Sequence, residues 1–376
     1  MNNTIGQAIT LTLFGESHGA EIGAVLDGIA PGLPVDEGKI ADALARRRPK
    51  DELSTKRREP DAFRIVGGVI DGHTTGTPLA LLIPNTAAHS EDYRSEGFLP
   101  RPSHADYPAF RKYHGYEDRR GGGHFSGRLT APLVAVGAVL LSALEAGGVN
   151  VHARISSLAG IRDEGDFGED ADRTPPEAKD FPVLSDAAGE RMKDAVRAAA
   201  RDGDSVGGTV EVFVTGVPAG LGEPWFDTME GELSKILFSV PAVKGVEFGD
   251  GFSLAAMRGS EANDPFALQG GRVVTLTNHS GGIGGGITNG MPLRFSVAIK
   301  PTPSIFRPQR TVDPIAMTEE ELTVHGRHDP TVVHRALPVL RAVCAFVLCD
   351  FLVRRYGTDS LVSGRFAALA KSEGCL

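Results

Sequence analysis

Cysteine and tryptophan are scarce in this sequence, whose 376 residues include three cysteines and one tryptophan. Three cysteines are too few for the disulfide framework on which small secreted proteins depend. Cys344 and Cys349 lie inside an apolar, helix-like run, where a thiol packs as a small hydrophobic group. We therefore expect both to be core residues, and we expect no disulfide framework.

Long uninterrupted apolar runs are absent too. The most apolar segment, VCAFVLCDFLV, contains Asp350 and is flanked by arginines, so we predict no membrane span. The N-terminal segment lacks the basic stretch, the apolar stretch and the small-residue cleavage site of a secretory signal. Hydrophobic residues make up 41% of the chain and charged residues 23%, which excludes disorder; we expect a cytoplasmic globular protein.

Net positive charge is lacking as well. The formal net charge of -9 argues against a general nucleic-acid-binding surface. Basic residues nevertheless cluster in the runs RRR (46–48), KRR (56–58) and DRR (118–120). A single basic run is usually solvated surface, but basic runs close to glycine-rich loops favour a site for a small anionic ligand.

The familiar nucleotide motifs are missing. Two glycine-rich segments occur, RRGGGHFSGR (119–128) and NHSGGIGGGITNG (278–290), and neither matches the phosphate loop of ATPases or the dinucleotide fingerprint. Glycines still let backbone N–H groups turn toward an anion. The first segment runs directly into a long apolar helical pattern, so it should lie at a helix N-terminus that favours negative charge. We expect a phosphate or a flavin phosphate there, with plain surface turns as the alternative for both segments.

Helix and strand patterns occur in clusters rather than in strict alternation. Residues 128–148 and 331–357 are predicted to form helices that are apolar on all sides, the second bent at Pro338. Such helices need cover on several sides, which strands at 207–218 and 291–301 can provide. The predicted fold class is therefore α+β, with helices enclosed between sheets, and not a doubly wound parallel sheet.

Two further regions complete this outline. The first 30 residues alternate as strands do, and His18 lies at the bend of a predicted hairpin. Residues 35–48 are predicted to form a short helix that ends in the first basic run. Residues 157–183 are acidic and rich in proline and glycine, and are predicted to be a surface excursion rather than a domain linker.

Three histidines are candidates for proton transfer. His18, His104 and His328 lie in turns with serine, arginine or aspartate neighbours that can set their protonation. No spacing among them suits a metal, so none is expected. Ser17, His18 and Asp106 would also be available for a hydrolase triad, but GESHG lies in a strand–turn with no helix after it, and we interpret its match to the hydrolase motif as chance.

Taken together and in order, several long motifs resemble the chorismate synthase family. They extend from residue 4 to about residue 350: FGESHGAEIGAVLDGIAPG, RPSHADY, GGGHFSGRLTAPLVAVGA, AVKGVEFGDGF, NHSGGIGGGITNG, KPTPS and GRHDPTVVHRALPVLRAV. The resemblance implies conversion of 5-enolpyruvylshikimate 3-phosphate to chorismate by 1,4-anti elimination of phosphate with loss of a C6 hydrogen. That reaction is the last step of the shikimate pathway in aromatic amino-acid biosynthesis.

The resemblance also implies cofactors, architecture and partners. It implies reduced FMN with no net redox change, and it leaves open whether NADPH is the reductant and whether a separate flavin reductase is a partner. It implies one β-α-β sandwich domain over residues 1–376, with antiparallel sheets enclosing the helices, and a homotetramer. It implies no contact with nucleic acid or membrane.

By the same resemblance, five residues have catalytic roles. His104 would protonate the departing phosphate, and His18 would lie near N1 and the C2 carbonyl of the flavin. Asp329 would help to relay the C6 proton by way of flavin N5. Ser17 and Ser126 would position flavin and substrate.

The family's binding positions also map onto this chain. The predicted flavin-binding residues are His124, Phe125, Ser126, Ala242, Gly285, Lys300, Pro301, Thr302, Pro303, Ser304 and Arg327. Arg47 corresponds to an arginine assigned to NADPH or substrate, and Arg128 to the arginine of an S-x-R motif. Many members read R-S-S-A-R where this chain reads HFSGR, so one arginine and one serine of the flavin loop are replaced.

Two other functions remain open on the sequence. A flavin reductase would oxidise NADPH without substrate, although no dinucleotide fingerprint supports it. A non-catalytic protein that binds a phosphorylated metabolite would keep the arginine clusters and glycine loops but would not need flavin.

Overall fold

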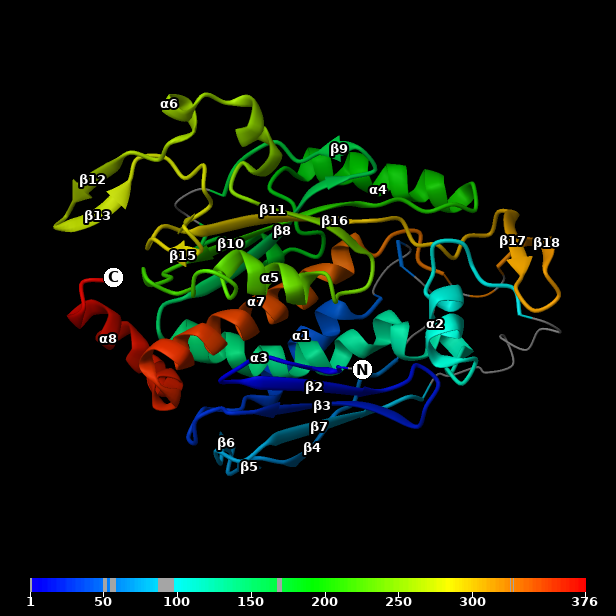
Figure 1. Ribbon diagram of the computed structural model, residues 1–376, viewed down its shortest axis with the longest axis horizontal. Helices are drawn as coiled ribbons and strands as arrows, with labels where there is room; N and C mark the ends of the chain where they lie inside the picture. The colour runs from blue at the N-terminus through cyan, green and yellow to red at the C-terminus, as the bar shows by residue number, and fades with distance from the viewer. Residues whose placement is uncertain are drawn as a thin grey trace.

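Two antiparallel sheets enclose a layer of helices in the computed structural model, which describes residues 2–49, 53–54, 59–86, 98–167, 171–324, 326 and 328–376. Figure 1 shows the first sheet below, the second above, and the long helices α3 and α7 between them. The α+β prediction with enclosed helices is therefore confirmed.

The first sheet is built from the N-terminal part of the chain. Its strand order is β1 (Thr4–Ile5), β2 (Thr10–Gly15), β3 (Glu21–Asp27), β7 (Leu79–Pro84) and β4 (Arg64–Gly67). The predicted hairpin is confirmed, because Gly15 of β2 pairs with Ile22 of β3 and His18 lies in the connection. Leu11, Ile22 and Leu81 point into the core, as the alternation of apolar residues predicts.

The second sheet comes from the middle of the chain. Its strand order is β11 (Val243–Phe248), β16 (Leu293–Ile299), β10 (Gly208–Thr215), β8 (Asn150–Leu158) and β9 (Ile161–Arg162). The strands predicted at 207–218 and 291–301 are β10 and β16, and they pair with each other, Val212 opposite Phe295. Both of these side chains are buried and face the helices.

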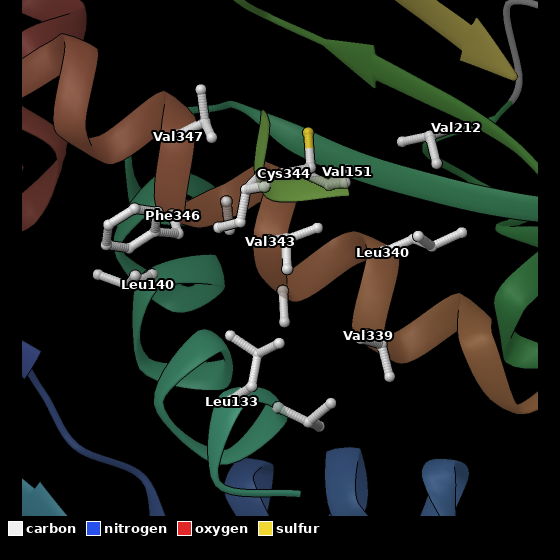
Figure 2. Close-up of a cluster of buried hydrophobic side chains, with 14 of the residues drawn as sticks. Leu133, Leu140, Val151, Val212, Val339, Leu340, Val343, Cys344, Phe346 and Val347 are labelled. Carbon is white, nitrogen blue, oxygen red and sulfur yellow. The ribbon is translucent and has the colours of Figure 1, made fainter. Parts of the chain in front are cut away.

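The enclosed layer consists of α1 (Glu37–Arg47), α3 (Thr130–Ala146) and α7 (Val333–Tyr356), all three of which the sequence predicts. A Cβ at Gly137 of α3 would lie 2.3 Å from Cβ of Ala342, so small residues bring α3 and α7 into close contact. Figure 2 shows Leu140 of α3 beside Phe346 of α7, and Cys344 near Val151 of β8.

Burial explains why these helices are apolar on all sides. The segment Gly127–Ala146 and α7 are long and apolar enough to cross a membrane, but 72% and 83% of their most apolar windows are buried inside the protein. Cys344 and Cys349 are fully buried, as predicted, and burial raises the pKa of the Cys344 thiol to about 12. They are core helices, and these thiols are packing groups.

The one carboxylate in the apolar part of α7 has a structural explanation. Asp350 is buried, and its Oδ1 accepts hydrogen bonds from the backbone N–H groups of Ala8 and Ile9, both at 2.8 Å, and of Gln7 at 3.3 Å. A buried carboxylate needs such donors to replace water. Asp350 therefore fastens the β1–β2 connection to the middle of α7.

The remaining elements surround this sandwich. The other helices are α2 (Asp106–Tyr113), α4 (Asp186–Arg201), α5 (Met229–Leu237), α6 (Gly259–Ala262) and α8 (Arg365–Ser372), with short 3₁₀ turns at Arg120–Phe125, Gly127–Leu129, Pro176–Ala178, Gly251–Ala256 and Thr358–Gly364. The small strand pairs are β5 (Val69–Ile70) with β6 (His73–Thr74), β12 (Phe266–Gln269) with β13 (Arg272–Thr275), β14 (Ile283–Gly284) with β15 (Ile287–Thr288), and β17 (Gln309–Asp313) with β18 (Thr318–Leu322).

Candidate active site

A cleft of about 1030 Å³ lies where the N-terminal ends of α3 and α7 meet the loop before α2 and the segment after β16. Pockets for single small molecules usually measure about 300–1,000 Å³, so this one has room for a flavin-sized molecule together with a small substrate. Twelve predicted site residues line it: Arg47, His104, His124, Phe125, Ser126, Arg128, Ala242, Lys300, Thr302, Pro303, Ser304 and Asp329.

His104 lies just before α2 and is held by a carboxylate. Its Nδ1 is 2.6 Å from Oδ1 of Asp106. Arg101 donates from Nε to Asp106 Oδ2 at 2.7 Å and from Nη2 to Oδ1 at 2.8 Å. Burial alone would raise the pKa of Asp106, but the hydrogen bonds from Arg101 and His104 outweigh it and hold this pKa far below its usual range. Asp106 is therefore ionised. Its histidine partner is His104, and it does not form a triad with Ser17 and His18.

The loop Arg120–Phe125 lies between two histidines and depends on glycine. Gly121, Gly122 and Gly123 have φ angles of 60°, 85° and 53°, a left-handed conformation that glycine adopts without strain. A Cβ at Gly121 would lie 2.5 Å from Nε2 of His18, and a Cβ at Gly122 would lie 3.4 Å from Cε1 of His104. A side chain at Gly121 would push His18 away, whereas a Cβ at Gly122 would only reach contact distance of His104.

Ser17 and His18 lie beneath this loop rather than on the cleft wall. Both are buried, and Ser17 donates its backbone N–H to the carbonyl of Gly123 at 3.0 Å. Gly121 lines the cleft, and a Cβ there would be 3.0 Å from Oγ of Ser17. The glycine backbone is thus the layer that separates Ser17 and His18 from the cavity.

Two buried arginines share one carboxylate at the base of the cleft. Arg47 donates from Nη2 to Asp61 at 2.9 Å, and Arg128 donates from Nη1 to the other oxygen of Asp61. Arg128 also donates from Nε to Asn85 at 3.0 Å and from Nη2 to the carbonyl of Pro84 at 3.1 Å. All three nitrogens of Arg128 therefore have protein acceptors.

One side-chain donor of Arg47 has no acceptor among the described residues. Its side chain is 6% exposed, and its Nε–H has no hydrogen-bond partner within the part of the chain that the structure describes. Burial lowers the pKa of Arg47 to about 10 although Asp61 opposes this shift, so the guanidinium stays charged at neutral pH. A buried N–H without a partner is costly, and a bound anion would satisfy it.

The segment from Lys300 to Ser304 connects the two sides of the cleft. Lys300 donates from Nζ to the carbonyl of Ser103, next to His104, at 2.9 Å. Thr302 donates from its hydroxyl to the carbonyl of Asp329 at 2.7 Å. Burial, together with the nearby Lys244, lowers the pKa of Lys300, which shows that positive charge accumulates here.

Asp329 lines the same cleft and is held by an arginine of α7. Its carboxylate accepts from Nη1 of Arg335 at 2.8 Å, and Arg335 donates from Nε to the carbonyl of Arg47 at 3.0 Å. Arg335 of α7 therefore joins the carboxylate of Asp329 to the backbone of Arg47.

The two residues that depart from the family pattern differ in their contacts. Nδ1 of His124 is 2.9 Å from the carbonyl of Gly15, and Nε2 is 3.3 Å from Oδ1 of Asn3. Its ring nitrogens are thus directed at protein groups. Phe125 is 37% exposed and presents an apolar surface to the cleft, with its ring centroid 6.1 Å from that of Tyr113.

Some predicted residues do not join the cleft. Gly285 lies in the β14–β15 hairpin formed by the second glycine-rich segment, and neither it nor Pro301 is among the lining residues. Arg327 lies outside the described residues. Of the two glycine-rich segments, only the first contributes to this cavity.

Four residues that sequence reasoning missed complete the site: Asn85, Asp61, Arg101 and Arg335. Asp61 follows closely on the KRR run, and Arg101 begins the RPSHADY motif, so both were near recognised signals. Their partners are distant in sequence, however: Asp61 meets Arg128 across 67 positions. Only the fold reveals such pairs.

The chain is similar along nearly its whole length to one family of proteins. Residues 9–353 match the family model described as chorismate synthase. Chorismate synthase of Thermococcus gammatolerans is 49% identical over 361 residues, covering 95% of this chain and 99% of that protein. Chorismate synthase of Pyrococcus abyssi is 47% identical over 353 residues, covering 93% and 97%. A crystal structure of chorismate synthase matches the fold with a TM-score of 0.77 at 28% identity, covering 99% of this chain and 100% of that one.

Proposed function

This chain belongs to the chorismate synthase family, and from that premise we propose how its own residues carry out the reaction. The chain is an enzyme, a lyase that converts 5-enolpyruvylshikimate 3-phosphate to chorismate and phosphate. The observation that carries the mechanism is one cavity faced by the His104–Asp106 pair, by Asp329 and by a surplus of cations.

The charge of the cleft suits this substrate, which has one phosphate and two carboxylates. The described lining residues include eight arginines and lysines and two carboxylates, Glu59 and Asp329. Arg47 offers an N–H that has no partner among the described residues, whereas the nitrogens of Arg128 are engaged. Arg47 therefore binds an anionic group of the substrate directly, and Arg128 holds Asp61 in place behind it.

His104 supplies the proton for the leaving group. When the C–O bond breaks, charge develops on the phosphate oxygen, and an imidazolium at hydrogen-bond distance can donate to it. Lys300, whose Nζ lies 2.9 Å from the carbonyl of the neighbouring Ser103, stabilises the same charge. His18, beneath Gly121, is placed to influence the cavity through the thin glycine layer.

Asp329 receives the proton that leaves C6. Its carboxylate is held by Arg335 and is partly exposed, with 16% of its side chain accessible. Loss of phosphate from one face and of the hydrogen from C6 completes the diene of chorismate. The acid and the acceptor are separate residues that line one cleft, as elimination from two ring positions requires.

The family requires a reduced flavin, and the cleft fits FMN. It has the volume for a tricyclic ring, and its left-handed glycines allow close approach of the backbone. Ser126, Phe125, Ala242 and the segment from Lys300 to Ser304 would hold the ring and its phosphate, with Gly285 and Arg327 retained as predictions. When bound, a reduced flavin supplies transient electron density that assists loss of the allylic phosphate without net oxidation.

An anaerobic turnover assay tests the function. Chemically reduced FMN should support chorismate formation from the phosphorylated substrate, measured by absorbance, with or without NADPH. Oxidised FMN without a reductant should support none, and turnover under that condition would contradict the proposal. NADPH oxidation in the absence of substrate would instead indicate that the chain reduces its own flavin, while tight substrate binding without flavin or turnover would favour a binding protein.

We also propose a cytoplasmic homotetramer with one domain per chain. Both sheets bury their inner faces against the same helices, which supports a single domain. Trp225 and Phe226 are 89% and 94% exposed, and Phe266 and Leu268 of β12 are 75% and 80% exposed, which supports association between chains. Light scattering coupled to gel filtration measures the number of chains, and a monomer at micromolar concentration would exclude the tetramer.

A further inference from the structure

The acid–base unit of the cleft extends beyond the residue that donates the proton. Asp106 is bonded at both carboxylate oxygens. Oδ1 accepts from His104 Nδ1 and Arg101 Nη2, and Oδ2 accepts from Arg101 Nε and from the backbone N–H of Arg101 at 3.0 Å. This side-on arginine pair with two extra donors fixes the carboxylate in one orientation.

The fixed carboxylate decides which nitrogen of His104 is available. An ionised carboxylate at 2.6 Å accepts a hydrogen bond, so Nδ1 carries a proton in both charge states of the ring. The exchangeable proton is then on Nε2, which lies on the side of the glycine loop, since a Cβ at Gly122 would be 3.5 Å from it. Nε2 has no hydrogen-bond partner among the residues described, and His104 lines the cleft.

Arg101 links this unit to the other wall. Its Nη1 donates to Oγ of Ser304 at 3.3 Å, in the segment predicted to hold the flavin. The side chains of Arg101 and Asp106 are each only 12% exposed, so the clamp is shielded from water. One arginine therefore connects the carboxylate that orients the acid with the segment on which the cofactor would rest.

We propose that Asp106 and Arg101 are positioning residues for the elimination. Asp106 keeps the proton of His104 on Nδ1 and directs Nε2–H at the leaving phosphate. Arg101 locks Asp106 in place and sets its distance from the segment Lys300–Ser304. The charged groups that face His104 from the packed elements are Asp106, which favours the imidazolium, and Arg101 and Lys300, which oppose it. This role rests on the proposed function of His104 as the acid.

The decisive variant is Asp106→Asn, which keeps the shape and removes the charge. We expect kcat to fall about 10²- to 10⁴-fold, the contribution of a well-placed proton donor, while KM and the affinity for reduced FMN change less than about threefold. The pH above which kcat declines should move to lower values, because the imidazolium loses its anionic partner. Arg101→Lys, which keeps the charge but not the fork, should lower kcat by a smaller factor.

Glu117→Gln is a matched control. Glu117 pairs with Arg119 at 2.7 Å, is largely buried and lies in the same part of the chain, but among the described residues it forms no hydrogen bond or ion pair with a histidine. If Asp106→Asn and Glu117→Gln lower kcat by the same factor, or if Asp106→Asn leaves kcat and its pH profile unchanged, Asp106 has only a structural role.

A spectroscopic readout keeps this test separate from the reaction. ¹H–¹⁵N correlation spectra of the histidine rings should assign His104 as protonated on Nδ1 in the wild type, and this signature should change in Asp106→Asn. If the wild type forms no chorismate with reduced FMN, the function of the site is wrong, but the tautomer still reports on the clamp. A wild-type ring protonated only on Nε2 would overturn the positioning role.

Discussion

Arg47 and Arg128 in the cleft share the single carboxylate of Asp61, whereas Arg154 on the second sheet contacts two carboxylates of its own. Arg154 donates to Glu211 at 2.6 Å and to Asp163 at 3.3 Å. Both sites are buried and both consist of arginines and acids. The cleft network has more cations than anions, and the sheet network does not.

The sheet network is completed by Arg294, which donates from Nε to Glu211 at 2.7 Å and approaches Asp166 at 3.5 Å. Its acids come partly from the acidic stretch 157–183, whose Asp163 accepts a hydrogen bond from Arg154 of β8. No side-chain nitrogen of Arg154 or Arg294 is left buried without a partner in the described chain, whereas Nε of Arg47 is. A buried arginine alone does not mark a binding site; Arg47 differs because it has a donor that is unpaired among the residues described and also lines the cleft.

The largest expected effect is on the balanced side. Glu211→Gln removes the carboxylate between Arg154 and Arg294 and leaves buried Arg154 with Asp163 as its one carboxylate in the described chain, which should lower the free energy of unfolding by about 3–5 kcal/mol. Urea unfolding measures it. Glu190→Gln breaks only an exposed pair with Lys193 and should cost less than about 1 kcal/mol. Equal losses in the two variants would show that the sheet network is not stabilised by its charges.

Arg47→Met, in contrast to Glu211→Gln, should lower activity more than stability. Loss of a charge-assisted contact to the substrate is expected to cost about 1.5–3 kcal/mol of transition-state stabilisation, which lowers kcat/KM about 10- to 150-fold. Arg128 still pairs with Asp61 in this variant. Arg154→Met should destabilise the fold and leave kcat/KM unchanged. Steady-state kinetics and urea unfolding on both variants separate the effect on kcat/KM from the effect on stability. If both variants lose stability and neither loses kcat/KM, the two networks do not differ in function.

Gly121→Ala tests the thin layer over His18. The added Cβ would lie 2.5 Å from the ring at a φ of 60°, so we expect a cost of about 1–2 kcal/mol and a fall in kcat of about tenfold. Gly127→Ala in the same loop meets open space and should be nearly neutral. Identical kinetics for the two alanine variants would mean that His18 does not act through the loop.

The smallest effect is a pH dependence on the balanced side. Burial would lower the pKa of His152, but hydrogen bonds to Glu177 and Asp172 outweigh it and raise this pKa. A raised histidine pKa gives stability that is fully present below the unfolded value of about 6.5 and is lost as pH rises through the folded value. The stability difference between wild type and His152→Gln should therefore be larger at pH 6 than at pH 9. A stability difference that does not change with pH would show that the ion pairs of His152 with Glu177 and Asp172 do not stabilise the fold.

The sequence predicts local features of this fold well. The β2–β3 hairpin, α1 and the apolar helices α3 and α7 follow from alternation, capping signals and apolar periodicity over adjacent residues. The charge networks do not follow from such patterns, because Asp61 contacts Arg128, and Glu211 contacts Arg154, only after the sheets have formed. Likewise, the two glycine-rich segments look equivalent in sequence, and only the fold shows that 119–128 borders the cleft and 278–290 does not.

The contact between α3 and α7 also has a consequence for how the chain is made. α3 ends at residue 146, and α7, which covers it, begins at residue 333. At a synthesis rate of about 5–20 residues per second, α3 emerges from the ribosome about 10–40 s before its partner exists. During that interval α3 can pack against α1 and the first sheet, but the face that later contacts α7 is uncovered. The face of α3 that packs against α7 is therefore buried only after residues 333–356 have been translated.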